Sequence, residues 1–423
     1  MRNTAIAPQK LNGTVMIPPS KSIGHRAIIC AALAKGVSTL TNIGISDDID
    51  ATVEAMKMLG ARIEREGGTL TIDGSNTFID IQHKTIDCKE SGSTLRFLIP
   101  LALHCNEITF IGSKRLGQRP LDLYYSLFDQ SGIVYETEGG CLPLTIHGGE
   151  INSKLEICGN VSSQFITGLL LSLPLLPINF QIQITSPLES KAYVDLTMDV
   201  MKEFGVEIHN NNYNTFFIKG GQAYQPKDYY CEGDFSQAAF YLVAGTLGND
   251  IKCKGLFANS RQGDKEILTI IEKMGGQIVV TDDIITAIPS ATEGITIDAA
   301  QIPDLVPILA VLGALSKGET RIINAQRLRI KESDRLAAIS EQLNLLGGIV
   351  IQKPDGLIIE GVNELRGAVT NGCNDHRIAM SIAIAATRAT EEVVVEDSDC
   401  VKKSYPNFWE DYQALGGVIC DRE

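Results

Sequence analysis

The sequence predicts an α/β protein of six similar units, and two sets of recurring residues support that prediction. Each unit opens with a polar turn before an apolar helix, and the equivalent openings lie 70 to 72 residues apart, at Ser20, Ser91, Ser162, Asp234, Asp304 and Asp375. A second helix in each unit ends at a glycine before a β-like run, and these glycines lie 69 to 73 residues apart, at Gly60, Gly132, Gly205, Gly275, Gly347 and Gly416. Two independent markers that stay in phase indicate an internal repeat of about 71 residues.

Within a unit, the hydrophobic pattern predicts the order β-α-β-α-β-β. The first helix is apolar almost all round, as in RAIICAALA, which places it in a core. The second helix is amphipathic: in AYVDLTMDVMKEFG, Tyr193, Thr197 and Val200 share one face while the acidic residues lie away from it. In strands such as TLTIDG, polar and apolar residues alternate, so we expect sheets that face water on one side and helices that lie inside.

Six units can form one large ring or two groups of three, and two groups fit the usual size of a domain better. The polar segment 220–234, which contains Pro226, follows the third unit and is the predicted crossing between the groups. The strand near 11–17 precedes the first unit, and the pattern alone leaves open whether it belongs to the other group.

Composition restricts the classes of function. The 423 residues carry a formal net charge of −14, which argues against a general binder of nucleic acid or of membrane surfaces. No run reaches the ~18 uninterrupted apolar residues of a membrane helix, and the first ten residues lack the apolar core of a secretion signal. The ten cysteines form no C-x-x-C pair or metal-like grouping, so we expect reduced thiols, a cytoplasmic protein and no metal site. Phosphate-loop, dinucleotide and zinc-helix patterns are also missing, so no cofactor is expected.

The helix openings carry the candidate binding residues. A helix N-terminus presents unpaired N–H groups and a partial positive charge, which attract anions. Basic side chains are added here, at Lys21 and Arg26 in the first unit and at Arg377 in the sixth. Taken singly, the serines and aspartates at the openings are better explained as helix caps: Ser20, Ser91, Asp304 and Asp375. Cations at several equivalent openings favour an anion-binding site.

The segment RLRIKESDRLAAISEQL is the densest cluster of charges in the chain. Read as a helix from Lys331, it places Glu332 and Arg335 three residues apart on one face. Two interpretations stay open on spacing alone. The segment is either a solvated helix start, whose exposed ion pair contributes little, or an acid placed beside cations that bind a phosphate.

Nine segments, in order along almost the whole chain, resemble the enolpyruvylshikimate-phosphate synthase family: PSKSIGHRA, ESGSTLR, GQRP, SSQFITGLL, SKAYVDLT, IPDLVPILA, RIKESDRL, NDHRIAM and KKSYPNF. The resemblance implies transfer of the enolpyruvyl group of phosphoenolpyruvate to the 5-hydroxyl of shikimate 3-phosphate, with release of phosphate and without a cofactor. It also implies two inside-out α/β barrels of three repeats each, joined by two crossings. The expected domains are then residues 19–231, and residues 1–18 together with 232–423, in a monomer.

The resemblance also implies a role for each matching position. The residues expected to bind shikimate 3-phosphate are Lys21, Ser22, Arg26, Ser162, Ser163, Gln164, Ser190, Tyr193, Asp304 and Lys331. Those expected to bind phosphoenolpyruvate are Lys21, Gly92, Ser93, Arg119, Gln164, Arg335, Arg377 and Lys403. Asp304 is expected to accept the proton of the attacking hydroxyl, Glu332 to protonate the methylene carbon, and Lys21 to touch both substrates. Because both halves of the chain contribute, we expect substrate binding to close the two domains.

Two positions depart from the family pattern, and two rival functions fit the residues less well. Glu90 stands where many members have asparagine, and Arg327 where asparagine or histidine is usual. By the same resemblance, glycine at position 92 is the residue type that leaves room for the inhibitor glyphosate, so sensitivity is expected. A sister enolpyruvyl transferase that acts on a UDP-sugar carries a cysteine in the loop that reads GSKRLGQRP here. A non-catalytic anion-binding repeat protein, the other rival, has no use for Glu332 beside two cations.

Overall fold

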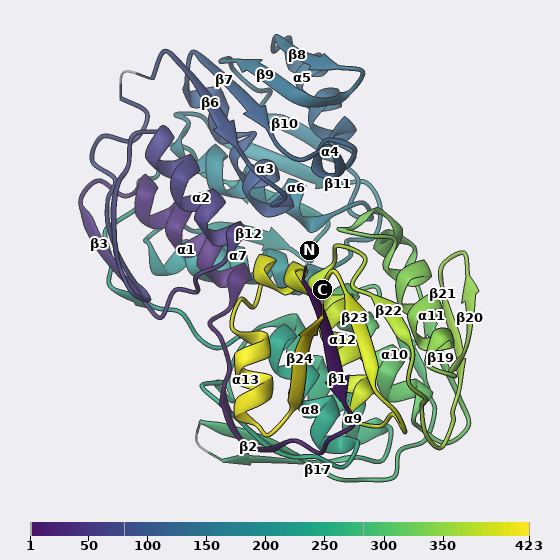
Figure 1. Cartoon of the computed structure of the whole chain (residues 1–423). Coiled ribbons are helices and arrows are strands. Elements are labelled where there is room, and N and C mark those ends of the chain that lie inside the picture. Colours follow the sequence, from purple (N-terminus) through teal and green to yellow (C-terminus); the bar gives the residue numbers. More distant parts are fainter. Residues whose placement is uncertain (1, 80, 282, 423) are drawn as a thin grey trace. The chain divides into compact units, whose positions relative to one another are not determined.

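The computed structural model describes residues 2–79, 81–281 and 283–422. The chain divides into two compact units (Figure 1). The N-terminal unit is Pro19–Cys231, and the C-terminal unit combines Met1–Pro18 with Glu232–Glu423. The chain therefore passes between the units twice, after Pro18 and after Cys231.

The described part of the N-terminal unit has three four-stranded sheets, each with one parallel and two antiparallel pairings. In sheet order, the strands are β14 (Tyr229–Tyr230), β3 (Val37–Thr41), β5 (Thr69–Asp73) and β4 (Arg62–Glu66); β6 (His83–Asp87), β7 (Glu107–Ile111), β9 (Cys141–His147) and β8 (Tyr135–Glu138); β10 (Lys154–Ile157), β11 (Phe180–Ile184), β13 (Thr215–Ile218) and β12 (Ile208–Asn211). The helices are α1 (Lys21–Leu33), α2 (Asp47–Met58), α3 (Gly92–Leu98), η1 (Leu101–His104), α4 (Lys114–Gly117), α5 (Asp122–Ser131), α6 (Ser163–Ser172), η2 (Leu173–Leu175) and α7 (Lys191–Glu203).

The C-terminal unit repeats this plan. In sheet order, its strands are β16 (Gln277–Thr281), β17 (Ile284–Ile288), β15 (Asp250–Lys254) and β2 (Asn12–Met16); β18 (Thr296–Asp298), β19 (Glu319–Ile323), β21 (Gly356–Glu360) and β20 (Ile349–Lys353); β22 (Val369–Asn371), β23 (Val393–Glu396), β1 (Asn3–Ala7) and β24 (Val418–Arg422). The helices are α8 (Phe235–Thr246), η3 (Gly263–Lys265), α9 (Glu266–Lys273), η4 (Pro303–Leu305), α10 (Val306–Ala314), η5 (Gln326–Ile330), α11 (Arg335–Leu345), α12 (His376–Ala386), η6 (Ser398–Lys403) and α13 (Phe408–Ala414). The expected order β-α-β-α-β-β is confirmed, as in β18-α10-β19-α11-β20-β21.

The two crossings exchange one strand between the units. Strand β2, which precedes the first repeat, pairs in parallel with β15, with Asn12 opposite Asp250. Strand β14, which precedes the fourth repeat, pairs in parallel with β3, with Tyr229 opposite Leu40. Each exchanged strand supplies the outer parallel position of a sheet, so both crossings form part of the hydrogen-bonded frame of the units.

The first helix of each repeat is buried, which fixes the direction in which its N-terminus points. Every residue of α1 from Ile23 to Leu33 is buried, and so are all residues of α8, α10 and α12. Small residues let these helices approach closely: a Cβ added at Gly168 of α6 would lie 2.4 Å from the carbonyl oxygen of Arg96 in α3. The strands alternate buried and exposed positions, as expected for sheets with one wet face. Only the ends of such buried helices can meet a ligand.

Two local features shape the helix ends. The first helix of the second repeat, α3, ends at Leu98 and the chain continues as the 3-10 helix η1, because Pro100 cannot donate an interior helical hydrogen bond. The helix expected from Lys331 begins at Arg335, because the Asp334 side chain accepts the Ala337 N–H and caps it. Among the described residues, no helix is long and apolar enough to cross a membrane.

Candidate active site

The six equivalent helix openings do not use their polar residue in the same way. At five of them the side chain caps the helix and accepts a backbone N–H. This confirms the caps predicted at Ser20, Ser91 and Asp375, and the structure adds caps at Ser162 and Asp234. The sixth residue, Asp304, lies in η4, and no cap hydrogen bond is made there. The cap interpretation is therefore wrong for Asp304, whose carboxylate faces side chains from later segments of its own repeat and from the sixth repeat.

Three cations contact the Asp304 carboxylate. Its Oδ1 accepts a hydrogen bond from Arg335 Nη1 at 2.8 Å, and its Oδ2 accepts one from Arg377 Nη2 at 3.2 Å. Lys331 Nζ lies 3.5 Å from Oδ1. Burial raises the pKa of Asp304, but the charges of Arg377, Lys331 and Arg335 outweigh burial and hold that pKa well below its usual range. Asp304 is therefore ionised in this arrangement.

Arg335, at the start of α11, is the centre of this cluster. Its side chain is 1% exposed, and it donates Nε to Asp375 Oδ2 and Nη2 to Glu332 Oε2, both at 2.8 Å. The contact of Glu332 with Arg335 is thus made, although the helix starts later than expected. Burial lowers the pKa of Arg335, and the carboxylates of Asp375, Glu332 and Asp304 reverse that effect and raise it well above its usual range.

The other predicted residues of this unit lie at neighbouring openings. Arg377, in the first turn of α12, also donates Nη1 to the Asp304 carbonyl oxygen at 3.1 Å. Lys403, at the end of η6, donates to the carbonyl oxygen of Asn374 at 2.7 Å, just before the same helix. The structure therefore brings the predicted residues Asp304, Lys331, Glu332, Arg335 and Arg377 into one cluster, with Lys403 near the opening of α12.

In the N-terminal unit, the predicted cations are braced by the protein. Lys21 Nζ lies 2.8 Å from Asp48 Oδ2 at the start of α2. Arg26, one turn further along α1, donates to Thr197 Oγ1 at 2.8 Å and to the carbonyl oxygens of Ser22 and Tyr193 at 2.6 and 3.0 Å. Arg26 thus ties the opening of α1 to that of α7, which carries Tyr193.

Gln164 has a fixed amide orientation. Its Oε1 accepts a hydrogen bond from Arg96 Nη1 at 2.8 Å, and its Nε2 donates to Ser93 Oγ at 3.0 Å. The Arg96 guanidinium lies over the Phe165 ring, 5.0 Å from its centre. These contacts bring the predicted residues Ser93 and Gln164 together between the openings of α3 and α6.

Gly92 lies in the same place, and a side chain there would meet two predicted residues. A Cβ added at Gly92 would be 2.7 Å from Arg119 Nη1 and 3.6 Å from Gln164 Oε1. Ser190, beside α7, is buried and has a φ of +56°, a left-handed conformation that non-glycine residues rarely adopt. Such local strain is found preferentially at functional sites.

The remaining predicted positions and the two departures are also placed. Ser22 is in the first turn of α1, Ser162 caps α6, and Ser163 begins α6 as a buried residue. Arg327 is buried in η5 and donates to the Ala300 carbonyl oxygen at 2.7 Å. Glu90 is half-buried in the turn before α3.

Sequence reasoning missed three residues of these clusters. Asp48 and Arg96 contact predicted residues directly, and Arg96 carried a usable signal as a charged residue inside an otherwise apolar helix. Asp264, at η3, is buried and accepts a hydrogen bond from Ser236 Oγ at the opening of α8. Burial raises the pKa of Asp264 to about 6, the nearby Asp304 charge acts in the same direction, and Arg377 opposes it.

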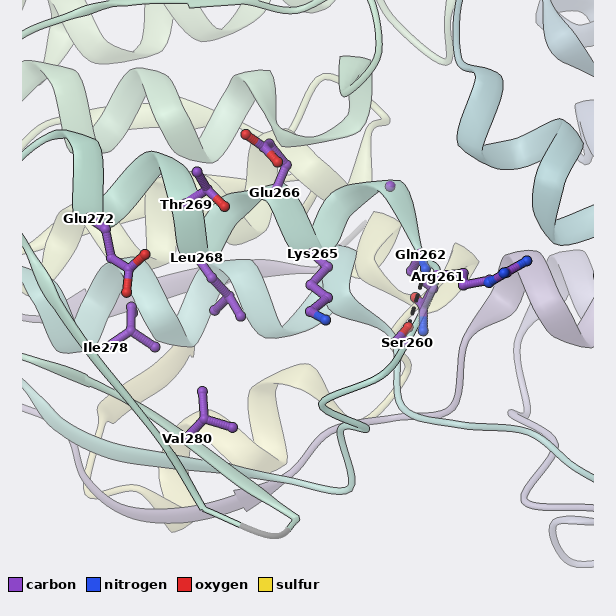
Figure 2. Close-up of a pocket in the computed structure, with 11 residues that line it drawn as sticks. Ser260, Arg261, Gln262, Lys265, Glu266, Leu268, Thr269, Glu272, Ile278 and Val280 are labelled. Atoms are coloured by element: carbon purple, nitrogen blue, oxygen red, sulfur yellow. Dashed lines mark hydrogen bonds between the residues drawn. The ribbon is translucent and has the colours of Figure 1, made fainter. Parts of the chain in front are cut away.

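A separate hollow of about 450 Å³ lies between α9 and β16 (Figure 2). Figure 2 shows Leu268, Ile278 and Val280 around it, with Lys265 and Ser260 toward one end. None of the residues predicted to bind substrate lines this hollow. Among the described residues, no group of three or more His, Cys, Asp or Glu side chains is placed to hold a metal ion.

Comparisons with known proteins all match the same enzyme family over nearly the whole chain. The family model of EPSP synthase (3-phosphoshikimate 1-carboxyvinyltransferase) matches residues 6–412. A protein of Clostridium perfringens named 3-phosphoshikimate 1-carboxyvinyltransferase is 53% identical over 421 residues, which is 99% of each chain. The protein of that name from Clostridioides difficile is 48% identical over 430 residues, 99% of this chain and 98% of its own. A solved structure of EPSP synthase from Acinetobacter baumannii superposes with a TM-score of 0.83 at 25% identity, covering both chains completely.

Proposed function

The chain belongs to the EPSP synthase family, and from this premise we propose that the two groups of side chains described above are the two halves of its active site. The enzyme transfers the enolpyruvyl group of phosphoenolpyruvate to shikimate 3-phosphate, a step of aromatic amino acid biosynthesis in the shikimate pathway. The observation that carries the site assignment is the contact of Asp304 and Glu332 with one buried cation, Arg335, at equal distances of 2.8 Å.

The N-terminal half is proposed to bind shikimate 3-phosphate. The openings of α1, α6 and α7 supply backbone N–H groups, hydroxyls and the cations Lys21 and Arg26, which suit a phosphate. Ser190, the residue at the N-terminus of α7, adopts a left-handed backbone conformation although it is not a glycine. Arg26 and its partners Thr197 and Tyr193 hold the openings of α1 and α7 together, so the phosphate would meet a preformed site.

The C-terminal half is proposed to bind phosphoenolpyruvate with Arg335, Arg377 and Lys403, aided by Arg119 and Lys21 from the N-terminal half. Arginine suits this ligand because its fork donates parallel hydrogen bonds to a phosphate or a carboxylate. Both substrates are anions, and two close charges repel by roughly 4 kcal/mol even with surface-like screening. The cations are therefore needed to bring the substrates together.

The proposed reaction uses two carboxyl groups in opposite directions. Glu332 protonates the methylene carbon of phosphoenolpyruvate, and the 5-hydroxyl of shikimate 3-phosphate attacks the resulting cationic carbon while Asp304 accepts its proton. The tetrahedral adduct then loses phosphate, which takes up the proton held by Asp304, while a proton returns from the methyl group to Glu332 and the double bond is restored. An anionic substrate beside Glu332 favours its protonated form, and the cations around Asp304 keep that residue ionised.

Phosphoenolpyruvate is proposed to contact both units, and shikimate 3-phosphate is proposed to contact Asp304 and Lys331 of the C-terminal unit as well. We therefore propose that these units act as domains that close on the substrates. Small-angle scattering of the enzyme with shikimate 3-phosphate plus glyphosate should show a smaller radius of gyration than the enzyme alone. An unchanged radius would contradict closure. We further propose a cytoplasmic monomer, for which light scattering should return a mass near 45.8 kDa.

The direct test of the activity is phosphate release. Incubation of the protein with both substrates should release phosphate in proportion to the shikimate 3-phosphate consumed. Replacing shikimate 3-phosphate by UDP-N-acetylglucosamine should give no release above background. Release with the UDP-sugar only would favour the sister transferase, and release with neither would favour a non-catalytic binding protein.

A further inference from the structure

The partners of Arg335 differ in how firmly they are held. Asp375 is completely buried, and it accepts hydrogen bonds from Arg335 Nε at 2.8 Å, from Ser333 Oγ at 3.0 Å and from the Arg377 N–H at 3.0 Å. Asp304 and Glu332 have side chains that are 19% and 18% exposed. The first partner is part of the core, and the other two reach the rim of the site.

The rim carboxylates occupy the donors that a substrate anion would need. Arg335 Nη1 donates to Asp304 and Nη2 donates to Glu332, each at 2.8 Å. Asp304 also accepts a hydrogen bond from Nη2 of Arg377, a second cation that is proposed to bind phosphoenolpyruvate. A buried N–H donor without an acceptor is costly, so protein carboxylates fill these positions when substrate is absent.

We infer that Asp375 is a positioning residue that permanently orients Arg335, while Asp304 and Glu332 are internal anions that phosphoenolpyruvate displaces from it. The inference rests on the proposed binding of phosphoenolpyruvate by Arg335. Asp375 fixes the guanidinium from the buried side through Nε and the inner face of Nη2. The Nη1 and Nη2 atoms then face the proposed site. There they can exchange their hydrogen bonds to two protein carboxylates for hydrogen bonds to the anionic groups of the substrate.

Displacement would also prepare the base. Arg377, Lys331 and Arg335 hold the pKa of Asp304 low in the absence of substrate, and an ion with a very low pKa is a poor proton acceptor. Once phosphoenolpyruvate draws these cations to itself, the pKa of Asp304 rises. The carboxylate therefore becomes a better base only when the second substrate is in place.

The same substitution, made in turn in two aspartates that contact Arg335, tests the inference. Asp304→Asn and Asp375→Asn each remove one negative charge from Arg335 and change the size of the side chain little. The probe is 2-phospholactate, which carries a phosphate and a carboxylate as phosphoenolpyruvate does but no double bond, so no turnover occurs. Its dissociation constant is measured by calorimetry at saturating shikimate 3-phosphate.

The expected changes have opposite signs. Asp304→Asn should tighten binding of 2-phospholactate about tenfold because a competing anion is gone, and Asp375→Asn should weaken it about tenfold because Arg335 is no longer oriented. Tightening in both variants would mean that only the net charge matters, and weakening in both would mean general damage to the site. Either result, or no binding to the wild type, would overturn the inference.

Controls separate this inference from folding and from the proposed function. Asn remains a good helix cap, so Asp375→Asn should keep the opening of α12, and Ser333→Ala offers a milder change that should weaken binding two- to fivefold. Asp250→Asn, at an exposed strand end, should leave binding unchanged. Phosphate release by the wild type tests the proposed function separately, because 2-phospholactate binding does not depend on turnover.

Discussion

Replacing Gly92 by alanine offers a quantitative test of the proposed phosphoenolpyruvate site. The added Cβ would lie 2.7 Å from Arg119 Nη1, whereas unstrained contacts of such atoms are about 3.5 Å. The Gln164 amide is 3.6 Å away and is held by Arg96 and Ser93, so it need not move. The guanidinium of Arg119 must therefore retreat by roughly 0.8 Å.

This shift sets the size of the expected effect. A misplacement of 1 Å at a reacting site costs up to about 100-fold in rate, so kcat/KM for phosphoenolpyruvate should fall roughly 10- to 100-fold. That loss corresponds to about 1.4 to 2.8 kcal/mol of transition-state stabilisation. The KM for shikimate 3-phosphate should change little, because the openings of α1, α6 and α7 keep their geometry.

The assay is the initial rate of phosphate release, measured against phosphoenolpyruvate at saturating shikimate 3-phosphate and then with the substrates exchanged. Gly68→Ala is the matched control, because the nearest atom to its added Cβ is 3.6 Å away. An unchanged kcat/KM for phosphoenolpyruvate in Gly92→Ala would refute the placement of Arg119. An equal loss for both substrates would point to general disruption instead.

Three further predictions concern the acids and the inhibitor. Asp304→Asn should lower kcat at least ~100-fold with both substrates saturating, because the proton acceptor is lost; near-normal turnover would show that another group is the base. The folded chain releases the Asp264 proton near pH 6 and the unfolded chain near 3.8, so wild-type stability should fall with rising pH in this window. Relative to Asp264→Asn, urea unfolding should show a loss of about 3 kcal/mol across the window, and parallel curves would contradict the buried acid. Glyphosate should compete with phosphoenolpyruvate, and inhibition without competition would argue against the room proposed beside Gly92.

The architecture follows closely from the sequence because its cause is local and repeated. Apolar helices that alternate with strands exposed to solvent on one face can fold in few ways. The same pattern recurs in all six repeats of about 71 residues. The parallel pairing of β2 with β15 could not be predicted from the local pattern. The pattern around 11–17 identifies a strand, but its partner lies more than 230 residues away, and only the family resemblance indicated the second crossing.

The candidate site was less accessible from spacing alone, and Asp304 shows why. Its position in the repeat is equivalent to that of five residues that cap helices, so a local rule predicts a cap. The contacts that free it from this role come from Arg335 and Arg377, 31 and 73 residues further along the chain. The same holds for the start of α11, where the Asp334 cap outweighed the apparent helix from Lys331. Residue spacing within one helix cannot report contacts between separate helices.

The acidic composition acquires a physical reason at these openings. A net charge of −14 argues against a general binder of nucleic acid or membrane surfaces but does not exclude small anions, and two small anionic substrates must be bound. Cations can be buried at helix ends only if anions accompany them, and the chain supplies these anions itself, with Asp48 beside Lys21 and Asp304 beside Arg335. A substrate anion then replaces a protein carboxylate instead of meeting a bare cation, so part of the binding free energy is spent on that exchange. Removing the carboxylate partner alone should therefore tighten binding of the substrate anion, and this gain should disappear once the cation is also removed, which a double-mutant cycle on Lys21 and Asp48 can measure.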